Sequence, residues 1–135
     1  MFEPIARFLA PRETISAAGG ADRLIAALHD WGVDPCSVLI ICDRIVDELG
    51  HTRPYLDALA ANGFSASVFT DIAGEPTAEM VDAAIAWART QKAEMVIGIG
   101  GGSSIDTSKL VAYALASGTP LEDIRAEMPA VPGLP

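Results

Sequence analysis

The sequence is short of basic residues and of aromatic residues, and each shortage narrows the possible functions. Only 9 of its 135 residues are Lys or Arg, against 18 Asp or Glu, so the formal net charge is −9. A nucleic-acid-binding surface needs clustered cations to neutralise phosphates, so this balance argues against nucleic acid as a partner. Aromatic residues make up 6% of the chain and hydrophobic residues 50%, which predicts one compact domain with a closely packed aliphatic core.

Cysteines and long apolar runs are also scarce. Cys36 and Cys42 lie six residues apart in one predicted strand, about 20 Å if extended, which is beyond the reach of a disulfide. We therefore expect free thiols and a reducing, cytoplasmic location. Apolar runs such as 38–42 and 95–99 are strand-sized and far shorter than the roughly 20 residues of a bilayer span. The first residues lack the basic start and apolar stretch of a signal peptide, so no membrane partner is expected.

The hydrophobic residues alternate between helical and strand spacing along the chain. The run 38–42 has no polar alternation, which is typical of a parallel strand covered on both faces. Thr77 is a predicted helix N-cap, with Glu79 in the first turn favouring the positive end of the helix dipole. The predicted elements are a helix over 24–31 closed by Gly32, a strand over 37–42, a helix over 55–59 closed at 62–63, a strand over 66–69, a helix over 77–88, a buried strand over 95–99 and a helix from about 103 to 116.

This alternation predicts an α/β fold, a Rossmann-like open and mostly parallel sheet with helices on both faces. The first 17 residues are expected to add an edge hairpin with Phe8 and Ile15 on its arms. Residues 1–127 would form the α/β domain. Residues 128–135 contain three prolines, cannot be helical and are interpreted as a linker.

Three adjacent glycines, Gly100, Gly101 and Gly102, follow the strand predicted over 95–99. In an open parallel sheet, ligands bind at the carboxyl ends of the strands, next to the helices that follow. Glycines let main-chain amides approach a phosphate closely, and the helix starting near Ser103 adds free N–H groups and a dipole. The segment matches neither a Walker loop nor the dinucleotide fingerprint in full. We interpret it as a phosphate-binding segment.

A purely structural role for the same segment stays open. The stretch 103–106 also fits a capping-box variant in which Asp106 only serves the start of the helix. Lys109 would then be the ion-pair partner of Asp106 at i+3, a contact worth a few tenths of a kcal/mol, about 0.2–0.5.

Asp43, at the end of the strand predicted over 37–42, is a second candidate. A carboxylate in this place can accept hydrogen bonds from a ribose diol, although it could equally cap a turn. The acid precedes the glycine cluster, whereas in the ordinary Rossmann order it follows. His29 and His51 show no metal-ligand spacing and are expected at the surface. No catalytic triad and no metal-binding carboxylate cluster is evident in the sequence.

The segment 98–109, GIGGGSSIDTSK, resembles the signature Gly-Gly-Gly-Ser-x-x-Asp-x-x-Lys of the iron-containing (group III) alcohol dehydrogenases. Segments 39–43 (LIICD), 74–77 (GEPT) and 19–21 (GGA) resemble that family too, so the resemblance covers nearly the whole chain. It implies the N-terminal domain of the dehydroquinate synthase-like superfamily. In that domain Gly101, Gly102 and Ser103 would contact the diphosphate of NAD(P).

The resemblance also implies further roles. Asp106 would lie near the nicotinamide side, and Asp43 would bind the adenosine ribose and repel a 2′-phosphate, which favours NAD over NADP. A helical C-terminal domain would supply a divalent metal, iron or zinc, and the alcohol or aldehyde site. This chain would therefore hold no catalytic residue and no metal ligand. Family members commonly dimerise, which implies a homodimer.

Two features of the sequence depart from the family pattern. Glu75 stands where the family frequently has Asn, which leaves the contacts on the adenine side open. The sequence also stops before the family's next strand, so the chain is expected to be inactive by itself. A truncated, non-catalytic nucleotide-binding or assembly module is the alternative. A receiver or flavodoxin-like domain would fit the alternation of elements but leaves the three glycines unexplained.

Overall fold

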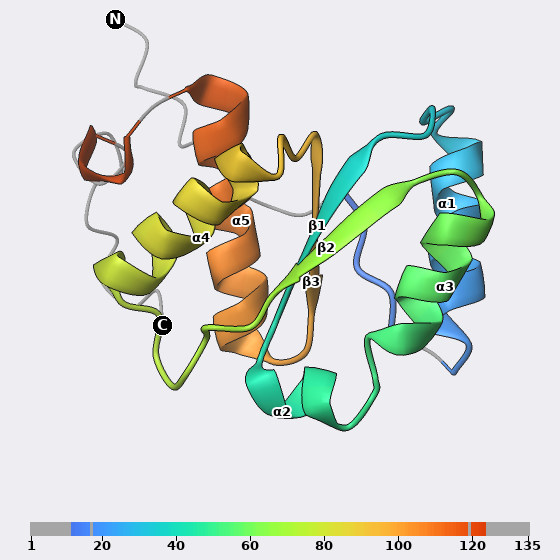
Figure 1. Ribbon diagram of the computed structural model, residues 1–135, viewed down its shortest axis with the longest axis horizontal. Coiled ribbons are helices and arrows are strands. Elements are labelled where there is room, and N and C mark those ends of the chain that lie inside the picture. Colours follow the sequence, from blue (N-terminus) through green and yellow to red (C-terminus); the bar gives the residue numbers. More distant parts are fainter. Residues whose placement is uncertain (1–11, 17, 119, 124–135) are drawn as a thin grey trace, which may run out of the picture.

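A computed structural model describes residues 12–16, 18–118 and 120–123. They form a layered α/β structure in which strands and helices alternate along the chain (Figure 1). The elements are α1 (Gly20–Asp30), β1 (Ser37–Cys42), α2 (Arg44–Glu48), α3 (Arg53–Ala61), β2 (Ser65–Phe69), α4 (Ala78–Thr90), β3 (Met95–Ile99) and α5 (Gly102–Ser117).

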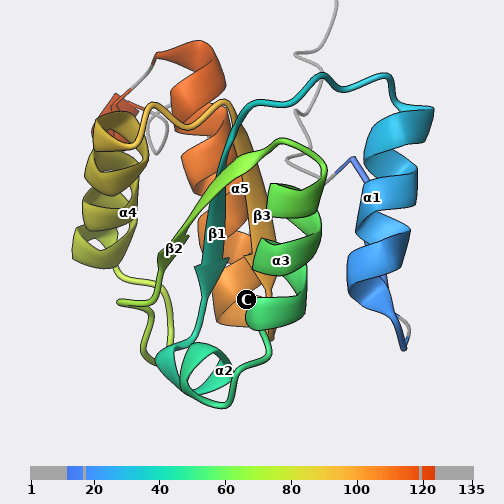
Figure 2. The ribbon, with the colours of Figure 1, turned by 45° about the vertical axis from the view of Figure 1, so that its right-hand side comes forward.

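The three strands form one parallel sheet in the order β2-β1-β3. Ile41 of β1 lies opposite Phe69 of β2, and Cys42 lies opposite Ile99 of β3. Helices α1 and α3 lie on one side of the sheet, and α4 and α5 lie on the other (Figures 1 and 2). The predicted Rossmann-like open sheet, parallel and covered on both faces, is confirmed. All strands point their carboxyl ends toward the same edge.

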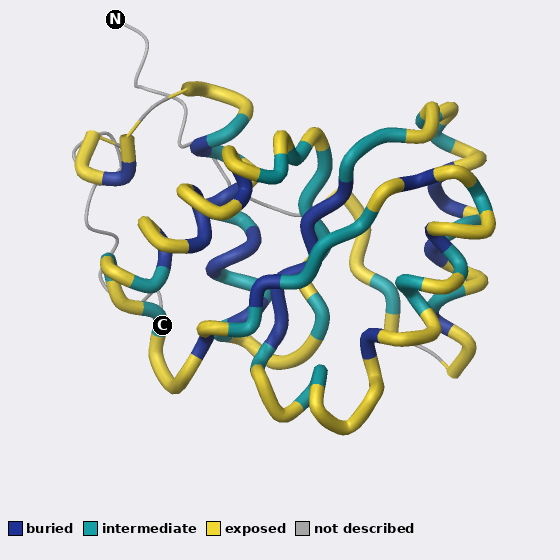
Figure 3. Tube along the Cα trace, viewed as in Figure 1, coloured by how far each residue is buried: buried dark blue, intermediate teal, exposed yellow. Residues whose placement is uncertain are grey.

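The core consists of two layers separated by β1. Leu39 and Ile41 pack against α4 and α5, while Val38 and Ile40 pack against α1 and α3, as the alternation of side chains along a strand requires. Figure 3 shows the buried centre along β1 and the exposed outer faces of the helices. The apolar run 38–42 is buried because helices cover both faces of β1, as predicted.

The helix ends agree with the sequence signals. The Thr77 hydroxyl accepts a hydrogen bond from the Met80 amide at 3.2 Å and caps α4. Gly32 and Gly63 follow the ends of α1 and α3, as predicted. Cys36 and Cys42 are free thiols. No helix among the described residues has both the length and the apolar character to cross a membrane.

Two predictions need correction, and one helix was missed. The strand β3 is not buried on both faces: Gly98 is exposed and its neighbours are half-buried, because β3 lies at the edge of the described sheet. The short helix α2 was not predicted, since five residues are too few to show a helical period. Residues 12–16, including Ile15, form no strand. The other arm of the predicted hairpin, with Phe8, and the linker over 128–135 lie outside the described residues.

Candidate functional site

The carboxyl edge of the sheet brings two of the predicted site residues together. Cys42 and Ile99 are paired across β1 and β3, so the next residues, Asp43 and Gly100, leave adjacent parallel strands at the same level. Neighbouring strands lie about 4.8 Å apart, which makes these two residues neighbours. Ligands of open parallel sheets bind at this edge. The sheet therefore allows Asp43 and the glycine cluster to contribute to one site, as the sequence predicts.

The glycine cluster is shaped for close approach to its main chain. Gly100 has φ +126°, a backbone conformation that L side chains rarely adopt. A Cβ added to Gly101 or Gly102 would have no heavy atom within 4 Å. Both residues are exposed. Their lack of side chains is therefore not required by packing, and it leaves the main-chain amides open to a ligand.

Helix α5 begins at the last glycine of this cluster and has no side-chain cap. Its N-cap is Gly101, which has no side chain to accept a hydrogen bond from the first turn. The first amides of a helix lack partners within the helix and carry its positive dipole end. Gly102 and Ser103 are the first residues of this turn. An anion, such as a diphosphate, fits this arrangement of donors.

The capping-box alternative is wrong. Because α5 already starts at Gly102, Asp106 lies one turn inside the helix rather than at its first turn. Its carboxylate accepts a hydrogen bond from the Lys109 ammonium at 3.2 Å, which is the predicted i+3 ion pair. Asp106 and Lys109 are partly exposed, at 43% and 30%.

A contact that the sequence did not reveal fixes α5 against β3. A Cβ added to Gly98 would lie 2.5 Å from Ser108 Oγ and 3.0 Å from Ser108 Cβ. The Ser108 hydroxyl donates a buried hydrogen bond of 2.6 Å to the carbonyl of Ser104. Gly98 is therefore needed for close packing, whereas Gly101 and Gly102 are not. The three-residue cluster and Gly98 have different physical roles.

Asp43 has the capping role that the sequence offered as one of two alternatives. One carboxylate oxygen accepts a hydrogen bond of 2.9 Å from the Ile45 amide and caps α2. Within the described part of the chain, the other oxygen has no hydrogen bond. Asp43 is only partly buried. A ribose hydroxyl could donate to this second oxygen without displacing the cap.

A cavity of about 670 Å³ opens next to Gly100. Its walls come from the first turn of α1, from α2, α3 and the turn that joins them, and from the end of β3. The Thr52 hydroxyl donates to Asp47 and orders the joining segment. Of the predicted cofactor residues, Gly100 is the one that lines this cavity. The volume is in the range of small-molecule sites, about 300–1,000 Å³.

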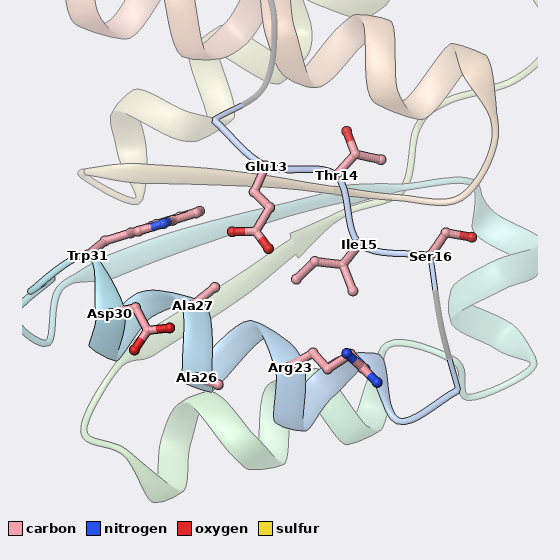
Figure 4. Close-up of a pocket in the computed structure, with 9 residues that line it drawn as sticks. All are labelled: Glu13, Thr14, Ile15, Ser16, Arg23, Ala26, Ala27, Asp30 and Trp31. Carbon is pink, nitrogen blue, oxygen red and sulfur yellow. The ribbon is translucent and has the colours of Figure 1, made fainter.

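A second cavity of about 360 Å³ lies between residues 13–16 and the side of α1 (Figure 4). Glu13 and Ile15 extend from this segment toward the helix, and Arg23 and Asp30 lie on the helix side. None of the predicted site residues lines this cavity. It does not belong to the carboxyl edge of the sheet, and we assign the site to that edge.

The part of the chain that the structure describes holds no group of three or more His, Cys, Asp or Glu that could bind a metal ion. His29 is exposed on α1, as expected. His51 is exposed in the turn before α3 and lines the larger cavity. The described residues therefore do not form a metal centre.

Comparison with known proteins agrees with the glycine signature. The family model described as iron-containing alcohol dehydrogenase matches residues 11–135. The chain belongs to this family. It is 33% identical over 108 residues to long-chain-alcohol dehydrogenase 1 of Geobacillus thermodenitrificans, an alignment that covers 80% of this chain. The same alignment covers 27% of that relative, so the chain spans about a quarter of the relative's length.

Two solved structures share the fold of this chain. NADH-dependent butanol dehydrogenase A of Thermotoga maritima superposes with a TM-score of 0.70 at 22% identity, covering 85% of this chain and 29% of that chain. Sulfoacetaldehyde reductase of Bifidobacterium kashiwanohense, solved in complex with NAD+, superposes with a TM-score of 0.67 at 25% identity. That match covers 79% of this chain and 27% of the reductase.

Proposed function

We propose that this chain binds a nicotinamide dinucleotide at the carboxyl edge of its sheet. The observation that carries the proposal is the uncapped start of α5, where Gly101 and Gly102 leave open space over main-chain amides. Such amides and the dipole of a 16-residue helix attract a diphosphate. The NAD+ complex of sulfoacetaldehyde reductase, a protein of the same fold, supports this choice of ligand.

The residues take distinct roles in this proposal. The amides of Gly101, Gly102 and Ser103 donate to the diphosphate, and Gly100 provides the sharp turn that presents them. Asp43 accepts a hydrogen bond from the adenosine ribose through the oxygen that does not cap α2. Asp106, one turn into α5, lies on the nicotinamide side.

NAD is the proposed cofactor rather than NADP. A 2′-phosphate would add about two negative charges close to the Asp43 carboxylate. Like charges at a short distance destabilise binding, particularly where the chain as a whole carries a net charge of −9. The ribose diol of NAD instead offers a hydrogen-bond donor to the same oxygen.

The reaction that we propose for the whole protein is hydride transfer between NAD(P) and an alcohol or aldehyde. The nicotinamide ring supplies the hydride chemistry when it is bound. In this proposal the described residues bind and orient the cofactor, and a divalent metal activates the substrate. We place the divalent metal, iron or zinc, and the substrate site in the part of the relatives that this chain does not span. By itself the chain is inactive in this proposal, and a cytoplasmic homodimer is its proposed form.

Calorimetric titration of the 135-residue chain with NAD+, ADP-ribose and adenosine tests the proposal. ADP-ribose retains the diphosphate and should bind nearly as well as NAD+, whereas adenosine should bind much more weakly. Addition of EDTA should leave all three affinities unchanged, because the proposed contacts involve no metal. Absence of NAD+ binding at millimolar concentration would contradict the proposal. It would favour the alternative of a non-catalytic module, which the limited span of the chain leaves open.

A further inference from the structure

We propose that Asp71 sets the discrimination between NAD and NADP by engaging Arg44, the cation closest in sequence to the ribose-binding carboxylate of Asp43. This proposal rests on the proposed function and adds a specificity residue to it. Asp71 lies in the loop after β2 and is 28 residues away from Asp43 along the chain. The two acids nevertheless meet at one edge of the sheet.

The register of the sheet places the three charges together. Ile41 of β1 pairs with Phe69 of β2. Continuing this register by two residues brings Asp43 to the level of Asp71, on the side of β1 that faces away from Gly100. The Arg44 guanidinium donates a hydrogen bond of 2.6 Å to the Asp71 carboxylate and thereby bridges the ends of β1 and β2.

The charge balance of this group favours NAD. Asp43 and Asp71 contribute two negative charges and Arg44 contributes one positive charge, which leaves a net charge of about −1. A guanidinium next to the adenosine ribose is the usual ligand of a 2′-phosphate in dinucleotide sites. Arg44 follows Asp43 directly in the sequence and could take this role, but its hydrogen bond to Asp71 competes with it. A 2′-phosphate therefore meets two carboxylates and an arginine that is already paired.

The pair can be opened at little cost. The side chains of Arg44 and Asp71 are 63% and 70% exposed. Exposed ion pairs stabilise proteins by no more than about 1 kcal/mol, so removing the carboxylate of Asp71 should not unfold the chain. It should instead release a flexible arginine that can form a charge-assisted hydrogen bond to phosphate. The structure thus predicts a change in cofactor preference without a change in fold.

The test compares the affinities for NAD+ and NADP+ by calorimetry in four forms of the chain: unaltered, Asp71→Asn, Arg44→Ala and the double variant. In Asp71→Asn the affinity for NADP+ relative to NAD+ should rise on the order of tenfold, the effect of one charge-assisted hydrogen bond at an exposed site. In the Arg44→Ala background no arginine remains to be released, so the same Asp71→Asn change should act only through the removed negative charge and alter the ratio by about twofold or less.

Asp57→Asn is the matched control. Asp57 forms an exposed ion pair of 3.1 Å with Arg53 on α3, and its replacement removes the same charge from the same type of pair. The ratio should not change in this variant. The proposal is overturned if Asp71→Asn leaves the ratio unchanged, or shifts it equally with and without Arg44, while NAD+ still binds. If neither nucleotide binds to any form, the proposed function itself is wrong, and this inference is wrong with it.

Discussion

Replacing Gly101 by valine should abolish tight dinucleotide binding without harming the fold. Gly101 has φ −85° and ψ −169°, an extended conformation that a β-branched residue adopts readily. A Cβ at this position meets no heavy atom within 4 Å. Replacing a glycine by a residue with fewer backbone conformations lowers the entropy of the unfolded chain. Where the native conformation is unstrained, this raises the unfolding free energy by about 0.4–1 kcal/mol. Valine is a poorer N-cap than glycine, which offsets this gain, so the melting temperature of Gly101→Val should change little.

The expected loss of affinity is large because several donors are affected together. The valine side chain would occupy the open space over the amides of Gly102 and Ser103. Hydrogen bonds to a charged group contribute about 1.5–3 kcal/mol each, so losing two of them costs at least about 3 kcal/mol. This corresponds to a fall in NAD+ affinity of more than about a hundredfold.

Calorimetry with NAD+ and thermal unfolding followed by circular dichroism measure the two effects separately. A variant that melts normally but no longer binds NAD+ supports the assignment. If Gly101→Val melts normally and binds NAD+ with unaltered affinity, main-chain contact at this position is refuted. Adenosine, which lacks the diphosphate, serves as a ligand whose weak binding should not depend on the substitution.

Two further predictions concern packing and pH. Gly98→Ala should lower the unfolding free energy, measured by urea denaturation, by about 1–3 kcal/mol, because its Cβ would overlap Ser108. Adding Ser108→Ala should recover part of this loss. An unchanged unfolding free energy in Gly98→Ala would refute the close contact. Burial, with smaller contributions from Asp47 and Asp43, raises the pKa of Cys42 from 9.0 to about 11. The unfolded chain therefore loses this proton at lower pH than the folded chain, and the unfolding free energy should fall as pH rises from about 9 toward 11. Cys42→Ala should flatten this dependence, and an unchanged slope would contradict the assignment.

The elements with long hydrophobic patterns could be predicted from the sequence. The continuous apolar run of β1 is paired on both sides and covered on both faces, so its composition alone shows its environment. The Thr77 cap and the glycines after α1 and α3 were equally clear, because these residues act locally. Helix α2 carried no comparable signal, since five residues make little more than one turn.

The site was predicted in outline but not in its contacts. Local sequence pointed to Asp43 and the glycine cluster, and the sheet brings both to one edge. The ion pair of Arg44 and Asp71 joins residues 27 positions apart, and only the strand register brings them together. The need for glycine at position 98 likewise depends on a side chain of α5. Such tertiary contacts leave no periodic trace in a single sequence.

The central claim is that main-chain amides at the start of α5 bind the diphosphate of the cofactor. Amide chemical shifts, followed by ¹⁵N–¹H NMR during titration of the 135-residue chain with NAD+, test it most directly. The largest shifts should occur at Gly101, Gly102 and Ser103, with smaller shifts at Asp43. Saturable shifts confined to the cavity between residues 13–16 and α1, with these three amides unmoved, would contradict the account.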